Sequence, residues 1–334
     1  MKPHVLIIHN SLGADSSTDE LDVIEQRDAI SASLGRLGYS SSSLALTLDL
    51  DRGAAAIRSL QPFCIVNLVE SLDGDDRLLA AAPLLYESLG IPFTGASSAA
   101  LAATSNKCFA KRIMDRCGIP TPQWIMLGNE LKPPQFFPCI IKSSTDHASI
   151  GINDDSIVTQ RDEWNCRVSR IRRRNNTELF TEEYIPGREF NCSIIEQENG
   201  EPLVFTPAEI SFEGYPEERP HIVGYSAKWD KTSTEYNHTV RRFSDDPKDK
   251  PLLATLSDIS RSCWELFSVK GCCRVDFRIN DAGKPFVLEI NANPCLSPDA
   301  GFAAACAHHG IDFDAMVNML LEGAVSSPGR QAKQ

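Results

Sequence analysis

The chain has 334 residues, enough for two or three domains with sizeable cores. Its composition, 42% hydrophobic and 23% charged, is ordinary for a soluble globular protein, and no apolar run is long enough to span a membrane. The formal net charge of −12 argues against nucleic acid as a partner, because binding a phosphate backbone requires a basic surface.

The cysteine usage predicts the cellular compartment. The chain has 11 cysteines, which are scattered and form no Cys-x-x-Cys pair. This pattern favours reduced thiols over a disulfide framework. The N-terminus also lacks the layout of a signal peptide, so we expect a cytoplasmic protein.

The first part of the chain alternates apolar strands with helices. Strands are predicted at 4–9, 43–48, 64–68 and 91–95, with helices at about 18–37, 54–59 and 77–89. This alternation predicts a parallel sheet with crossover helices. We place the first domain at residues 1–97.

A second unit is expected over residues 98–184. Its first helix can be capped by Thr104 or Ser105 and stops at Gly118. The further predicted elements are a strand at 138–142, a polar loop at 143–149, a strand ending at 158, a charged helix at 161–173 and a strand at 178–184.

The third unit, residues 185–324, begins at the turn Pro186-Gly187 with a strand at 189–195. Its polar and aromatic middle, about 211–243, is predicted to be a long surface excursion, a common place for a functional loop. Residues 325–334 are predicted to be a disordered tail.

Two segments near the C-terminus, 273–278 and 286–294, alternate polar and apolar residues. We predict a hairpin of two strands with one polar face. Asp276 lies on that face of the first strand, and Glu289 and Asn291 lie on that of the second. Converging oxygen ligands of this kind suit Mg²⁺ at nucleotide phosphates. A solvated hairpin face is the alternative.

Lys142 ends an apolar strand and precedes the loop of small hydroxylic residues that contains Ser149. Such a loop can cradle phosphates with backbone N–H groups while the ammonium neutralises their charge. A polar hairpin with a lysine that extends to solvent is the alternative. Lys107, on the preceding helix, is by itself typical of a solvated helix face.

The segment 181–190 leaves one unit and enters the next, so it offers free backbone groups at a hinge. Adenine needs such pairing, together with an acceptor for its amino group and a carboxylate for the ribose hydroxyls. Glu182 and Glu189 fit those two roles. An exposed acidic strand is the alternative.

In their order and spacing these elements resemble the ATP-grasp carboxylate–amine ligases, most closely the D-alanine–D-alanine ligase-like branch. The resemblance runs from Val5 to about Leu321. The segments that carry it are 90–95, 107–111 with 118–122, 182–190, and 274–278 with 288–291. It implies the α/β (α+β) ATP-grasp fold of three domains, with a Rossmann-like parallel sheet in the N-terminal domain and two sheets that clamp ATP.

The resemblance also implies residue roles. The residues that would bind ATP, through its phosphates or its adenosine, are Lys107, Lys142, Ser149, Glu182, Tyr184, Ile185 and Glu189. Lys228 would reach the γ-phosphate from a mobile loop, and Arg274 would stabilise the tetrahedral intermediate. Two Mg²⁺ ions, with Mn²⁺ as an alternative, would bind the metal ligands Asp276, Glu289 and Asn291.

The implied reaction joins two small molecules, a carboxylate and an amine. The carboxylate attacks the γ-phosphate to give an acyl phosphate and ADP, and the amine then displaces phosphate. We expect the 143–149 loop and the loop that carries Lys228 to close over the site as lids. A homodimer through the N-terminal domain is a common trait of the family.

The chain departs from the family pattern in its substrate-binding parts. Ala148 replaces a catalytic serine of the phosphate loop, Trp229 replaces that serine's tyrosine partner, and Ala300 replaces the serine that grips the second substrate's carboxylate. Pro294-Cys295 stands in place of Pro-Gly, and a glutamate that orients the first amine aligns only near Asp19 or Glu20.

We therefore expect a ligase for amino-acid-like substrates other than D-alanine. The alternatives are a D-alanine–D-alanine ligase of cell-wall synthesis, a phosphotransferase of similar fold without an amine acceptor, and a nucleotide-binding regulator that has lost turnover. The last is disfavoured because the three metal ligands and the lysines are all present.

Overall fold

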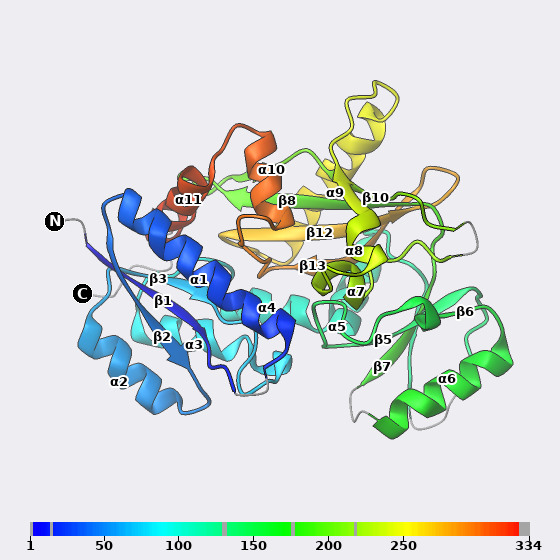
Figure 1. The fold of residues 1–334 in the computed structure, drawn as a ribbon, viewed down its shortest axis with the longest axis horizontal. Helices are drawn as coiled ribbons and strands as arrows, with labels where there is room; N and C mark the ends of the chain where they lie inside the picture. The colour runs from blue at the N-terminus through cyan, green and yellow to red at the C-terminus, as the bar shows by residue number, and fades with distance from the viewer. Residues whose placement is uncertain (1–2, 14–15, 129–131, 175–177, 217–218, 327–334) are drawn as a thin grey trace.

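The computed structural model describes residues 3–326 except 14–15, 129–131, 175–177 and 217–218. This part of the chain forms one parallel and two antiparallel β-sheets with helices packed between and around them (Figure 1). The predicted α/β class is therefore confirmed. None of its helices is both long enough and apolar enough to cross a bilayer.

The parallel sheet has β1 (His4–Asn10) between β2 (Ser40–Leu46) and β3 (Cys64–Leu68). Strands β1 and β3 are apolar runs because both of their faces are covered. Helix α1 (Thr18–Arg36) covers one face, and α2 (Leu50–Leu60) with α3 (Ala81–Leu89) covers the other.

Two predicted elements of this unit differ in the structure. The strand predicted at 91–95 is wrong, because only a single bridge joins Phe93 to Ile65 and Pro92 has no N–H to donate. The helix predicted at 77–89 is interrupted: the 3-10 helix η1 (Asp76–Leu78), capped by the Asp75 carboxylate, precedes α3.

The smaller antiparallel sheet has the order β4 (Trp124–Met126), β7 (Leu179–Glu183), β5 (Cys139–Ser143), β6 (Ile157–Val158). The helices α4 (Ser98–Ser105) and α5 (Lys107–Cys117) precede it, and α6 (Arg161–Arg174) packs on it. The predicted strand ending at 158 is shorter than expected, because a turn at Gly151 and the 3-10 helix η2 (Asp154–Ser156) occupy the residues before β6.

The larger antiparallel sheet has the order β11 (Thr239–Arg242), β10 (Ala208–Phe212), β8 (Arg188–Glu196), β12 (Cys272–Ile279), β13 (Pro285–Asn291), with β9 (Pro202–Val204) paired to β8. The excursion predicted at 211–243 is not irregular throughout. It contains the short helices α7 (Tyr225–Trp229) and α8 (Thr234–His238) and ends in β11.

Strand β12 shows how the sequence divides the faces of this sheet. Cys273, Val275 and Phe277 are fully buried in a core shared with α9 (Lys250–Leu266). Because side chains alternate along a strand, Arg274 and Asp276 project from the opposite face. That face looks toward the smaller sheet, with α7 between them in Figure 1.

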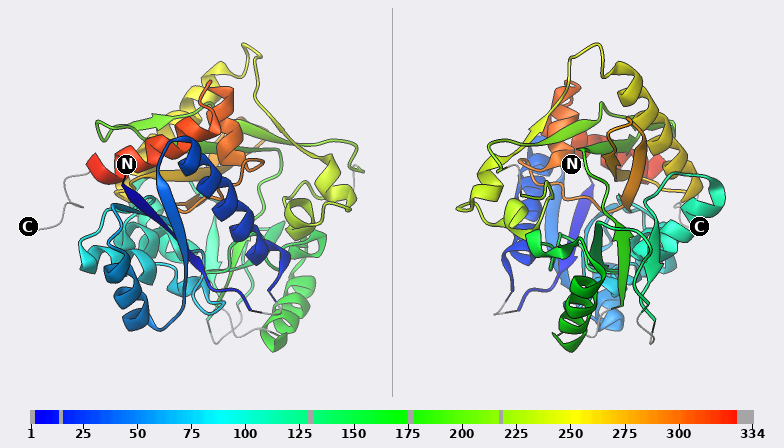
Figure 2. Two further views of the ribbon diagram at one scale, coloured as in Figure 1. Left: turned by 60° about the vertical axis from the view of Figure 1, so that its left-hand side comes forward. Right: turned by 90° about the vertical axis from the view of Figure 1, so that its right-hand side faces the viewer.

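The two ends of the chain share one core. Helices α10 (Gly301–His308) and α11 (Phe313–Ser326) contribute to the same hydrophobic cluster as α1, β1 and β3. Figure 2 shows α11 lying against α1. Helix α11 extends through Ser326, so residues 325 and 326 of the predicted tail are helical, and the rest of that prediction, 327–334, lies outside the described residues.

Two glycines bring the N-terminal part and the larger sheet into backbone contact. Gly271 has φ +71°, and a Cβ built there would lie 2.6 Å from the backbone nitrogen of Gly95. No side chain fits between them, so the two backbones approach as closely as glycine alone permits.

Candidate functional site

The predicted metal ligands stand opposite each other on the polar face of the larger sheet. The register pairs Asp276 with Glu289 and Arg274 with Asn291, and it shifts at a β-bulge just after Asp276. The hairpin therefore brings two carboxylates and an amide together, as its alternation predicted. Their role as metal ligands stays a prediction.

Asp276 is held in a fixed orientation. Its carboxylate accepts hydrogen bonds from Arg274 Nε at 2.7 Å and Nη2 at 2.8 Å, and from Asn191 Nδ2 at 2.8 Å. Among the described residues no three His, Cys, Asp or Glu side chains gather as metal ligands. The two carboxylates and one amide still suit Mg²⁺, which keeps water or phosphate oxygens as its other ligands.

Cations surround Glu289. Lys107 Nζ lies 3.5 Å from Glu289 Oε2. Burial raises the pKa of Glu289, but Lys107, Lys228 and Arg274 together hold it below its usual value. Burial, followed by the charge of Arg274, lowers the pKa of Lys228. Positive groups therefore gather beside the two carboxylates, where an anionic ligand would be attracted.

Glu182 is bound by two lysines rather than left open for a ligand. Its carboxylate, 1% exposed, accepts a hydrogen bond from Lys142 Nζ at 2.6 Å and forms a second ion pair with buried Lys111. Burial raises the pKa of Glu182, but the two lysines bring it below its usual value. The carboxylate thus positions Lys142, and its predicted contact with adenine stays untested.

The hinge between β7 and β8 is held by Arg278, for which the sequence analysis predicted no role. Its Nη1 donates to the carbonyl of Gly187 at 2.9 Å, and its Nε lies 3.5 Å from Glu189 Oε2. Its guanidinium lies over the Tyr184 ring, 5.2 Å from the centroid. Ile185 is buried beside them. A cavity of about 320 Å³ adjoins this hinge and is lined in part by Tyr184.

The two predicted lid segments contact each other. Ser149 Oγ donates to the carbonyl of Val223 at 2.9 Å, and Trp229 Nε1 donates to the carbonyl of Ala148 at 3.0 Å. Ala148 and Ser149 both have positive φ, 56° and 61°. Such backbone strain, about 1–3 kcal/mol for each residue, is common at binding sites. The Ser149 hydroxyl therefore binds the second segment.

The second segment is also tied to the N-terminal unit. Tyr225 Oη donates to Asp19 Oδ1 at 2.7 Å. Glu20 instead accepts the backbone N–H of Ser17 at 2.8 Å and caps α1. Of the two acids that aligned loosely with the family's glutamate, Asp19 is thus the one that faces the lid.

His147 is a site residue that the sequence analysis missed. Its backbone N–H donates to Asp76 Oδ2 at 3.1 Å, while its buried Nε2 has no hydrogen-bond partner within the described ranges. Burial, with help from the charges of Lys107 and Lys228, lowers the pKa of His147 to about 3. A neutral imidazole therefore lies next to the cations, and only its place in the hydroxylic loop hinted at this.

Cys295 and Ser297 have a structural role in this region. Cys295 Sγ and Ser297 Oγ donate to the two carboxylate oxygens of Asp22 at 3.0 and 3.2 Å. Gln26 Nε2 bridges Asp22 and Glu70, at 3.0 and 3.1 Å. The segment after β13 is thus fastened to α1 by polar contacts.

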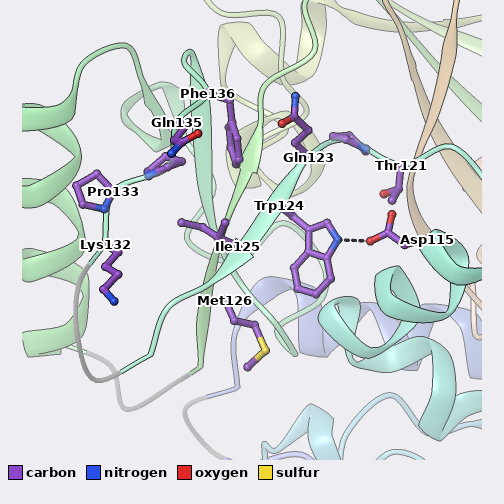
Figure 3. A pocket seen from close by; sticks show the side chains of 12 residues that line it. Asp115, Thr121, Gln123, Trp124, Ile125, Met126, Lys132, Pro133, Gln135 and Phe136 are labelled. Carbon is purple, nitrogen blue, oxygen red and sulfur yellow. Dashed lines mark hydrogen bonds between the residues drawn. The ribbon is translucent and has the colours of Figure 1, made fainter.

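A separate cavity of about 680 Å³ lies along the edge strand β4 (Figure 3). Trp124 projects into it and donates from Nε1 to Asp115 Oδ2 at 2.9 Å. None of the predicted site residues lines this cavity. It is therefore distinct from the cluster between the two antiparallel sheets.

Residues 113–322, well over half of the chain, match the family model described as the D-ala D-ala ligase C-terminus. A D-alanine–D-alanine ligase of Aquifex aeolicus is 25% identical over 93% of this chain and 98% of its own length. The uncharacterized protein y4sG of Sinorhizobium fredii is 28% identical over 78% of this chain and 74% of its own length.

Solved structures share the fold. The D-alanine–D-alanine ligase of Bacillus anthracis complexed with ATP has a TM-score of 0.74 and 20% identity, covering 97% of this chain and 98% of that one. The D-alanine–D-alanine ligase of Coxiella burnetii has a TM-score of 0.71 and 18% identity, covering 97% and 94%. The fold is therefore the ATP-grasp fold.

Proposed function

The chain belongs to the D-ala D-ala ligase family, and from that premise we propose that this ATP-grasp ligase joins two D-alanine molecules through an acyl phosphate. The observation that supports the proposal most directly is the convergence of Asp276 and Glu289 with Lys107, Lys228 and Arg274 on one sheet face. Phosphoryl transfer needs positioning and charge neutralisation more than covalent chemistry, and this cluster is suited to both.

The substrate is the point at which the sequence analysis and the relatives differ. Ala148, Trp229 and Ala300 favour substrates other than D-alanine, whereas the relatives matched over nearly their whole length are D-alanine–D-alanine ligases. We follow the relatives. In the structure Trp229 bonds the loop at Ala148 itself, so a lid contact is present without the family's serine and tyrosine.

Each residue of the cluster would have a separate role in the reaction. Lys107, Lys142 and Lys228 would hold the phosphates of ATP, and Mg²⁺, held by Asp276, Glu289 and Asn291, would neutralise charge on them. The carboxylate oxygen of one substrate bonds to the γ-phosphorus as the bond to ADP breaks. The amine of the other then bonds to the acyl carbon, a proton goes to solvent, and phosphate leaves. Arg274 would stabilise the oxyanion between these steps.

Isosteric substitutions test this proposal. Asp276→Asn and Glu289→Gln keep the shape of the hairpin while removing a carboxylate, so we expect ADP release with MgATP and D-alanine to fall about 10³-fold or more. Asp258→Ala, on the exposed face of α9, is the matched control and should keep full activity. Full activity of either site variant would contradict the metal assignment.

Product analysis separates the remaining alternatives. A ligase should yield D-alanyl-D-alanine with stoichiometric ADP, and hydroxylamine should trap the acyl phosphate as a hydroxamate. A phosphotransferase without an amine acceptor would release ADP without forming the dipeptide. If a screen of amino-acid pairs showed turnover only with amino acids other than D-alanine, the substrate class predicted from the sequence would be the correct one.

A further inference from the structure

Arg241 of β11 lies on the same sheet face as the candidate metal ligands. The register places Arg241 opposite Ile210, Ile210 opposite Glu189, and Glu189 opposite Arg278. Residues paired directly across neighbouring strands project from the same face. Arg274, Asp276 and Arg278 occupy every second position of β12 and therefore share one face. Arg241 thus projects from the face that carries the candidate metal ligands.

The guanidinium of Arg241 is half-buried, and no hydrogen bond or ion pair within the described ranges engages it. Its neighbour Arg242 does form an ion pair, with Glu213. Burial and the nearby charge of Arg274 lower the pKa of Arg241, while Asp299 opposes them from beyond ion-pair distance. A partly desolvated guanidinium beside a second one calls for an anionic partner.

Arg241 packs at the start of α10. A Cβ built on Gly301 would lie 3.3 Å from Arg241 Nη2 and 3.5 Å from its Nε, so the absence of a side chain at 301 makes room for the guanidinium. The residue before it is Ala300, whose side chain gives the helix no capping hydrogen bond. The guanidinium thus lies next to the residue that follows Ala300, the position at which the resemblance expects a serine.

We propose that Arg241 binds the carboxylate of the amine substrate, so that the acceptor is an amino acid with a free carboxylate rather than a simple amine, an amide or an ester. This inference rests on the proposed ligase function and adds the residue that selects its acceptor. A planar guanidinium binds a carboxylate through two parallel hydrogen bonds, which a single hydroxyl cannot do. The departure at Ala300 is then offset within the same region.

The experiment compares an amino acid with its amide as the acceptor. D-Alaninamide has an amine but no carboxylate, so it can accept an acyl group and cannot be activated. We expect the unmodified enzyme to prefer D-alanine over D-alaninamide as acceptor by about 30–100-fold, the size of a charge-assisted hydrogen-bonded pair. In Arg241→Gln the preference should fall to about threefold or less, through a higher KM for the acceptor.

Hydroxylamine trapping distinguishes acceptor binding from loss of the whole site. It reports acyl-phosphate formation and needs no acceptor carboxylate, so Arg241→Gln should keep hydroxamate formation within about twofold. Arg241→Lys keeps the positive charge but loses the pair of parallel N–H donors. Its acceptor preference should lie between those of the unmodified enzyme and Arg241→Gln. Ala300→Ser in the Arg241→Gln background should recover part of the preference. Arg242→Gln, the exposed neighbour, is the matched control.

Two results would overturn the inference while leaving the ligase function intact: an unchanged acceptor preference in Arg241→Gln, or an equal loss of hydroxamate and dipeptide. Absence of hydroxamate from D-alanine in the unmodified enzyme would instead reject D-alanine as the substrate. The same comparison, of an amino acid with its amide, then applies to the acceptor that supports ADP release. An enzyme that prefers the amide there would reject the role of Arg241.

Discussion

Glu70 is a carboxylic acid whose pKa is raised by its surroundings in the folded protein. It is half-buried at the end of β3, where it accepts a hydrogen bond from Gln26 Nε2 at 3.1 Å. Burial raises its pKa to about 7, and the carboxylates of Asp22, Asp76 and Asp19 add to the shift. In the ligand-free protein Glu70 therefore holds its proton up to near-neutral pH.

This shift predicts a pH dependence of stability. The folded protein keeps a proton that the unfolded chain releases above about 4.5, so the contribution of Glu70 to stability is lost as pH rises from about 4.5 to about 7. Urea unfolding at pH 5 and pH 8 should show that Glu70→Gln gains about 1–3 kcal/mol relative to the unmodified protein over this interval. Parallel pH profiles for the two proteins would contradict the shift.

At this scale the sequence predicts residues whose neighbours are set by local periodicity. Asp276, Glu289 and Asn291 could be brought together because a hairpin with period two fixes their faces. Arg241 could not, because its place on the site face depends on the order of four strands that are distant in the chain. His147 gave no signal beyond its place in the hydroxylic loop, and Arg278 gave none beyond its place on the polar face of the first strand.

Among the elements, α7 and the loop after β5 belong to the two segments that are predicted to act as lids, and they contact each other. Tyr225 bonds Asp19, Trp229 bonds the carbonyl of Ala148, and the backbone N–H of Tyr225 donates to the carbonyl of Ile152 at 3.0 Å. The position of α7 therefore depends on a small number of hydrogen bonds to two different units. Helix α7 could not be predicted, because its five residues are too few to show the repeating apolar pattern by which a helix is recognised in a sequence.

Tyr225→Phe tests this arrangement. Losing the hydrogen bond to Asp19 should weaken closure by about 1 kcal/mol, so the amides of 148–152 and 223–229 should exchange with solvent about fivefold faster. Hydrogen exchange measured by mass spectrometry checks this, with Tyr236→Phe on α8 as the control. Unchanged exchange in both segments would show that the Tyr225 contact does not hold the lid.

Over the whole molecule, the first and third predicted units share one hydrophobic core, whereas the smaller sheet and α6 have a core of their own. Phe302 of α10, 1% exposed, contacts Phe205, with ring centroids 6.2 Å apart, in the same cluster as Val5 and Val66 of the parallel sheet. The resemblance to a known family predicted three sheets and their order. The shared core was not predictable, because nothing in a local pattern indicates that α11 returns to α1.

Phe302→Ala should therefore destabilise the N-terminal sheet as well as the larger sheet. We expect a loss of about 3–5 kcal/mol in the free energy of unfolding, with fluorescence and circular dichroism still reporting one transition. Leu84→Ala, at an exposed position of α3, is the control and should change little. A separate N-terminal transition, unmoved by Phe302→Ala, would show that the first unit folds by itself.

The contact of Gly271 with Gly95 restricts how this protein could be recombined with its relatives. A hybrid that takes the segment before Lys107 from another enzyme must place the backbone of residue 95 equally close to Gly271, whatever its overall similarity. Even alanine at 271 would clash with the backbone of Gly95, so the N-terminal part and the larger sheet would have to move apart. Compatibility of parental halves is thus decided by the hydrogen atom that stands in place of a side chain at residue 271.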